Sequence, residues 1–186
     1  MKITGLTLYK VKPRWIFLKV NTDEGITGWG ELISGGKTKS VEAALIEMGE
    51  KIIGIDPNRI EDTWQMMFRS FFRGGPTLMT VISGIEMALW DIKARWLNVP
   101  IYELLGGKAR EKIMVYSWIS GKSTGDFVKA ALEKKENGFS AIKLLAMDNC
   151  HYIDSYLKIK AVADRIGEIR AAVGDNFGIG IDFHGR

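Results

Sequence analysis

The first part of the chain alternates between apolar and polar positions with period two and then changes to a helical period. Ile16, Leu18 and Val20 recur at every second position, which is typical of a strand with one buried face. Residues 22–25 follow and end in a glycine suited to a positive φ, so a turn is expected before the chain returns as a strand. Residues 1–33 are therefore predicted to form a three-stranded antiparallel meander.

Apolar residues then recur at helical spacing in three segments, 41–52, 60–71 and 78–96. Stretches that contain glycine and proline separate these segments and are typical of helix boundaries. A sheet followed by helices predicts an α+β domain, which we place at residues 1–112.

From residue 113 onwards, strand-like and helix-like segments alternate. Strands are expected at 113–118, 139–145 and 177–183, with helices at 126–137 and 155–173. This order predicts the first three βα strands of a TIM-like barrel, in the α/β class, over residues 113–186. A closed barrel has eight strands and typically about 250 residues, so the predicted barrel is incomplete.

Composition narrows the range of functions. The 186 residues carry 26 Lys and Arg and 22 Asp and Glu, a net charge of +4, with the two signs mixed along the chain. We expect no nucleic-acid partner, because such binding favours clustered basic residues, and no membrane partner, because no run of about 18 apolar residues occurs. Cys150 is the only cysteine, which excludes an internal disulfide, and the N-terminus shows no signal-peptide pattern. These features favour a cytoplasmic protein.

Candidate chemistry gathers at the ends of the predicted parallel strands. Asp182 and His184 are two residues apart, so they lie on one side of the last strand if that strand continues through both. Lys143 lies in the last part of the preceding strand and is expected to project from the same end of the sheet, where it could polarise a carboxylate or act as a base. Barrel enzymes place their chemistry at this end of the strands. A solvated polar strand end and an ordinary surface lysine are the alternatives.

Two arginines mark candidate lid segments. Arg14 lies between the first two predicted strands, and Arg73 precedes Gly74 and Gly75 between two predicted helices. A guanidinium group on a loop suits bidentate binding of a substrate carboxylate. The alternative is an exposed arginine in a loop that ends a helix.

Several motifs together resemble a known family. Residues 22–31, 87–94 and 104–107 are similar to the N-terminal capping domain of the mandelate racemase and muconate lactonizing branch of the enolase superfamily. Residues 182–186 resemble the third barrel strand of the galactonate dehydratases in particular. The motifs occur in the family's order, and the resemblance covers essentially the whole chain.

The resemblance implies a Mg²⁺-dependent lyase that dehydrates a small sugar acid, an aldonate such as galactonate. It implies that Asp182 is the first of three metal-binding carboxylates and that His184 is the acid that protonates the departing hydroxyl. Lys143, Arg14 and Arg73 are expected to bind the substrate. In this family the other carboxylates and the base come from later strands, so this chain alone is expected to be inactive. The full-length enzyme is expected to be a homo-oligomer.

One position departs from the family pattern. Leu145 stands where the family usually has a polar residue, and its side chain cannot hydrogen-bond a substrate. The alternatives are therefore a different enzyme of the superfamily, such as a mannonate dehydratase, an epimerase or a racemase. A non-catalytic remnant that associates with a complementary chain is the remaining alternative.

Overall fold

The computed structural model describes residues 1–70, 74–147, 151 and 153–184. The chain divides into two compact units, Met1–Ala109 and Arg110–Arg186, and each has its own hydrophobic core.

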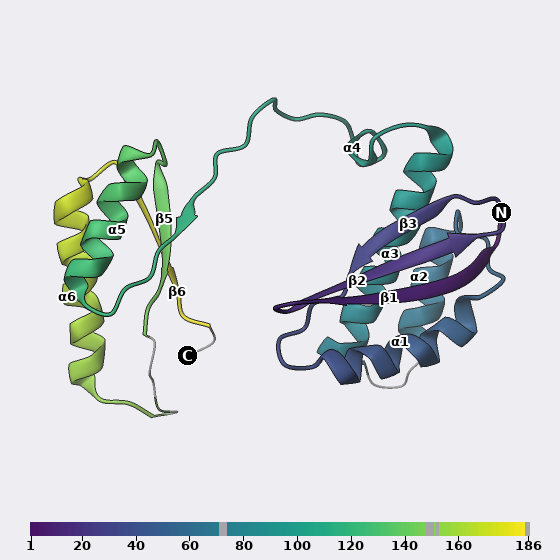
Figure 1. The fold of residues 1–186 in the computed structure, drawn as a ribbon, viewed down its shortest axis with the longest axis horizontal. Helices are drawn as coiled ribbons and strands as arrows, with labels where there is room; N and C mark the ends of the chain where they lie inside the picture. The colour runs from purple at the N-terminus through teal and green to yellow at the C-terminus, as the bar shows by residue number, and fades with distance from the viewer. Residues whose placement is uncertain (71–73, 148–150, 152, 185–186) are drawn as a thin grey trace. The chain divides into compact units, whose positions relative to one another are not determined.

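The first unit begins with an antiparallel sheet of three strands in the order β1-β2-β3 (Figure 1). The strands are β1 (Ile3–Val11), β2 (Trp15–Thr22) and β3 (Thr27–Glu31). Ile16, Leu18 and Val20 are each at most 2% exposed, so every second residue of β2 enters the core. The predicted meander is confirmed.

Four helices complete this unit: α1 (Thr38–Ile52), α2 (Ile60–Arg69), α3 (Pro76–Leu97) and the short α4 (Ile101–Leu104). The long α3 packs against the sheet beside β3, as Figure 1 shows. The backbone of α3 approaches so closely at Gly28 and Gly30 that a β-carbon on either glycine would collide with the carbonyl oxygens of Ala88 and Gly84. Glycine is required at these two positions by the close approach of two backbones.

The second unit is a parallel sheet, β4-β5-β6, with two helices on one face. The strands are β4 (Ser117–Trp118), β5 (Ala141–Leu145) and β6 (Gly178–Asp182), and the helices are α5 (Thr124–Glu136) and α6 (Tyr156–Val173). Ile142 and Leu144 point towards the helices and are at most 1% exposed. A capping domain followed by part of a (β/α) barrel, as predicted, is confirmed.

Four predicted strand boundaries in the second unit are wrong, and two of them are the starts of β5, at Ala141 instead of 139, and of β6, at Gly178 instead of 177. Only Ser117 and Trp118 of the expected strand 113–118 pair with β5, opposite Ile142 and Lys143. Residues 113–116 have apolar side chains but no ladder partner within the described chain, and Met114 is 81% exposed. At the other end, β6 stops at Asp182, before the predicted end at Phe183.

None of the helices in the described parts of the chain is both long enough and apolar enough to cross a membrane.

Candidate functional site

The parallel register brings side chains from two strands together on the sheet face opposite the helices. Lys143 pairs with Gly180, and Leu145 pairs with Asp182, at the carboxyl ends of β5 and β6. Because side chains alternate along a strand, Lys143, Leu145 and Asp182 lie on one face while Ile142 and Leu144 fill the core on the other.

Asp182 is the centre of a small ionic cluster, which we call the Asp182 cluster: Lys143, Asp182 and His184. The Lys143 Nζ lies 2.8 Å from Asp182 Oδ2, and the His184 Nε2 lies 3.2 Å from the same oxygen. The His184 backbone N–H also donates to Asp182 Oδ1 at 3.0 Å. All three residues predicted from the strand ends are thus in contact.

The route by which His184 reaches this cluster differs from the prediction. His184 lies beyond the end of β6 and has a left-handed backbone, with φ of 48°. A tight turn stabilised by the hydrogen bond to Asp182, rather than strand alternation, brings the imidazole back to the carboxylate.

The cluster stabilises the charged forms of its lysine and aspartate. The hydrogen bond to Asp182 raises the pKa of Lys143 above its ordinary value, and the same bond lowers the pKa of Asp182. Lys143 is therefore a cation and Asp182 an anion at neutral pH. This favours Lys143 as a group that binds a substrate carboxylate over Lys143 as a base.

Two aromatic residues of the site were missed by sequence reasoning. The Lys143 ammonium lies 5.6 Å from the ring centroid of Trp118 and 6.0 Å from that of Tyr116. Both distances suit cation–π attraction. Tyr116 and Trp118 are two residues apart, and Trp118 itself pairs with Lys143, a register that the sequence alone does not give.

The two candidate lid arginines lie earlier in the chain than the second unit. Arg14 belongs to the first unit, between β1 and β2, and its guanidinium carbon lies 5.6 Å from the ring centroid of Trp15. Arg73 lies outside the described residues.

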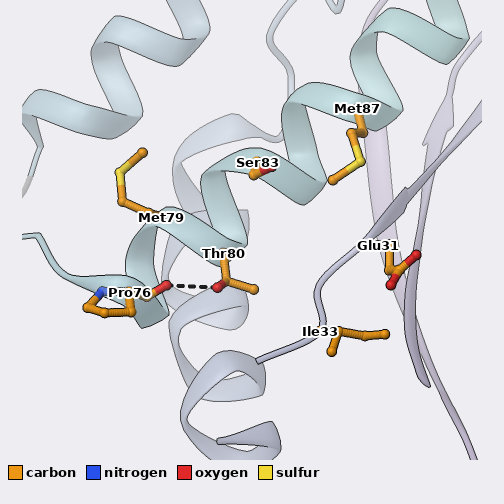
Figure 2. Close-up of a pocket in the computed structure, with 7 residues that line it drawn as sticks. All are labelled: Glu31, Ile33, Pro76, Met79, Thr80, Ser83 and Met87. Atoms are coloured by element: carbon orange, nitrogen blue, oxygen red, sulfur yellow. Dashed lines mark hydrogen bonds between the residues drawn. The ribbon is translucent and has the colours of Figure 1, made fainter. Parts of the chain in front are cut away.

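The first unit contains a pocket of about 400 Å³ between the end of β3 and α3. Figure 2 shows Glu31 and Ile33 on one side and Thr80, Ser83 and Met87 on α3. The Thr80 hydroxyl donates to the Pro76 carbonyl at 2.7 Å. Glu31 is the only charged side chain that lines this pocket in the described residues, and it lies in the segment 22–31 that resembles the family's capping domain.

The described residues alone do not form a metal centre. No group of three or more His, Cys, Asp or Glu side chains is arranged to hold a metal ion within residues 1–70, 74–147, 151 and 153–184. Asp182 supplies one carboxylate, which Lys143 and His184 already contact. Mg²⁺ prefers about six oxygen ligands, so further ligands are needed besides Asp182.

Comparison with known proteins identifies the family. Residues 7–106 match the model of the mandelate racemase / muconate lactonizing enzyme N-terminal domain. The chain belongs to this family. This match confirms the resemblance to the enolase superfamily that we inferred from residues 22–31, 87–94 and 104–107.

Relatives and a solved structure extend the similarity over the whole chain. D-galactonate dehydratases of Ralstonia pickettii (strain 12J) and Cronobacter sakazakii (strain ATCC BAA-894) are 49% and 46% identical to it over 187 residues. A crystal structure of an enolase from Pantoea ananatis, with bound D-gluconate and Mg, is 27% identical with a TM-score of 0.87. The match covers 98% of this chain and 53% of that structure. The chain spans about half the length of these curated relatives, covering 49% of each.

Proposed function

We propose that this chain supplies the N-terminal part of a Mg²⁺-dependent aldonate dehydratase, with galactonate as the first candidate substrate. The Asp182 cluster carries the proposal, because it places a carboxylate, an imidazole and a cation at the carboxyl ends of parallel strands. The sequence similarity of the whole chain to D-galactonate dehydratases supports the same reaction class.

In the proposed reaction, the α-proton of the sugar acid is removed and the β-hydroxyl leaves as water. His184 donates a proton from its imidazole to the departing hydroxyl as the carbon–oxygen bond breaks. Lys143 binds the substrate carboxylate as a cation, and Trp118 and Tyr116 restrict its ammonium group. The enol that remains becomes the 2-keto-3-deoxy acid. The base that removes the α-proton is not among the residues that we assign.

Asp182 is the proposed metal ligand from this chain, and the family resemblance implies that the other two carboxylates come from later strands. A bound Mg²⁺ would act as a Lewis acid towards the substrate carboxylate and stabilise the negative charge that follows α-proton removal. When Asp182 serves as a ligand, the hydrogen bonds that it accepts from Lys143 and His184 N–H would orient its carboxylate.

The first unit is proposed to contribute arginines that bind the carboxylate of the substrate. Arg14 and Arg73 are the candidate carboxylate-binding residues of this unit, because guanidinium groups bind carboxylates in a bidentate fashion. The domain boundary between capping domain and barrel is placed at residues 112 and 113.

The test uses the native protein isolated from its source. With Mg²⁺ present, it should convert galactonate to a 2-keto-3-deoxy acid, measured by semicarbazide absorbance or NMR. His184→Asn should lower kcat by about 10² or more, because general acid catalysis contributes on that order. Failure to dehydrate any member of a panel of aldonates would sink the proposal.

The same panel separates the alternatives within the superfamily. Leu145 pairs with Asp182 and its side chain cannot hydrogen-bond a substrate hydroxyl. The panel therefore also determines which sugar acid is the substrate. Turnover of mannonate but not galactonate would identify a mannonate dehydratase. Inversion of a stereocentre without loss of water, read by NMR in D₂O, would identify an epimerase or racemase.

A further inference from the structure

A second cluster of cations lies on the helix-covered side of the second unit. Lys122, Lys158 and Arg165 line a pocket of about 270 Å³, together with apolar walls that include Ala146 and Val162. Ala146 continues the alternation of Ile142 and Leu144, which face the helices. The pocket therefore lies on the opposite side of β5 from Lys143.

Arg165 lies over an aromatic ring and has buried nitrogens without a hydrogen-bond partner in the described chain. Its guanidinium carbon lies 4.6 Å from the ring centroid of Phe127, a side chain that is 2% exposed. Two of its nitrogens, Nε and Nη1, are buried and have no hydrogen-bond partner in the described chain. A guanidinium group keeps its charge at every relevant pH, so it is costly to leave these two buried donors without an acceptor.

The charged side chains that line this pocket in the described residues are all cations. Lys158 Nζ forms an ion pair with Asp154 Oδ2 at 2.7 Å, which compensates one of the three cations. That contact lowers the pKa of Asp154 to about 2, so its carboxylate stays charged at neutral pH. No acidic residue lines the pocket among those that the structure describes.

We propose that this pocket binds a small oxyanion, a phosphate or carboxylate group, with Arg165 as the principal contact. Arg165 packs over the Phe127 ring, which restricts its side chain, and guanidinium groups bind such anions in a bidentate fashion. Lys122 supplies a second positive charge from the loop before α5. The site is separate from the proposed dehydratase chemistry, and its test needs no turnover.

The experiment measures thermal unfolding of the 186-residue chain during titration with sodium phosphate, sodium galactonate or sodium chloride at matched ionic strength. A saturable rise in Tm with phosphate or galactonate, absent with chloride, is expected. Phosphate alone as the effective ligand would assign a phosphate site. A galactonate effect would assign a carboxylate site only if Arg165→Leu removes it, because galactonate is also the proposed ligand of Lys143. The absence of any saturable effect would overturn the proposal.

Variants locate the effect. Arg165→Leu should weaken the apparent affinity by about tenfold or more, the scale of a lost charge-assisted hydrogen bond. Lys160→Gln is the matched control on the same helix, because Lys160 pairs with Asp164 and does not line the pocket. If Arg165→Leu does not fold, the exposed Lys122→Gln carries the test and should also weaken binding. Unchanged affinity in the folded pocket variant would refute the site.

Discussion

Lys143 and Asp182 come from different strands, and their contact rests on the parallel register of β5 and β6. Because the pKa of Asp182 is lowered in the folded chain, its contribution to stability is present above the ordinary carboxyl pKa. That contribution is lost as the pH falls through the lowered value. The pKa of Lys143 is raised in the folded chain, so its contribution to stability is present below the ordinary lysine pKa. That contribution is lost as the pH rises through the raised pKa.

Replacing the lysine tests this pair directly. In Lys143→Gln, the pKa of Asp182 should rise towards its ordinary value, because the largest cause of its lowering has been removed. Carbon-13 NMR of the Asp182 carboxyl group during a pH titration measures the change. Lys160→Gln removes a cation that pairs with Asp164 instead, so it should leave the titration of Asp182 unaltered. An unchanged Asp182 titration in Lys143→Gln would show that the pair does not form in solution.

Among single residues, those whose position follows from strand alternation were the most predictable. Lys143 and Asp182 fall on the face expected for them, because both lie inside regular strands. His184 reaches Asp182 by a turn with a positive φ, which sequence spacing does not indicate for a histidine. Trp118 and Tyr116 required knowledge of the register across β4 and β5, which arises only from the packed sheet.

At the scale of elements, the approach of α3 to β3 depends on two glycines. Gly30→Ala should destabilise the first unit by about 1–3 kcal/mol, because its new methyl group would collide with the Gly84 carbonyl of α3. Thermal unfolding measures the effect. Gly35→Ala is the control, since nothing lies within 4 Å of the β-carbon it would add. Equal Tm values for the two variants would show that α3 is not held so close to β3.

The start of α5 depends on a capping box. The Ser123 side chain accepts a hydrogen bond from the Asp126 backbone N–H at 3.2 Å, and Asp126 accepts one from the Ser123 N–H at 2.9 Å. Ser123→Ala should cost about 1 kcal/mol of unfolding free energy in urea. Ser120→Ala removes a nearby exposed hydroxyl that makes no cap, and its unfolding curve should overlay that of the unaltered chain. A neutral Ser123→Ala would contradict the cap.

Elements with a strong internal pattern were predicted well, and their ends were not. The helical period of 78–96 anticipated α3 because its apolar face, with Ile85 and Leu89, is buried along most of its length. The apolar run at 113–118 suggested a strand of equal length, yet pairing with β5 includes only Ser117 and Trp118. Hydrophobicity predicts the tendency of a segment to form a strand, whereas the length of a strand depends on a partner.

At the scale of the whole molecule, the apolar side chains of residues 113–116 are largely exposed in the described chain. Ile113, Met114 and Val115 are between 60% and 81% exposed. Exposed apolar residues beside an unpaired strand edge favour association. We therefore expect the isolated chain to self-associate or to bind a complementary chain in analytical ultracentrifugation. A compact monomer at all concentrations would remove the basis of the alternative in which the chain acts as a non-catalytic partner.

The isolated 186-residue chain should not dehydrate any aldonate, even with saturating Mg²⁺. Asp182 is its proposed metal ligand, and no cluster of three ligand side chains occurs in the described residues. Mg²⁺ bound through one carboxylate keeps most of its waters and binds weakly. The same assay on the native protein from its source is the control and should show turnover. Turnover by the purified chain, with no other polypeptide present, would mean that its own residues include the base and the remaining ligands. In that case Glu31 would be the first candidate to replace, because it lines the pocket of the first unit together with the hydroxyl groups of Thr80 and Ser83.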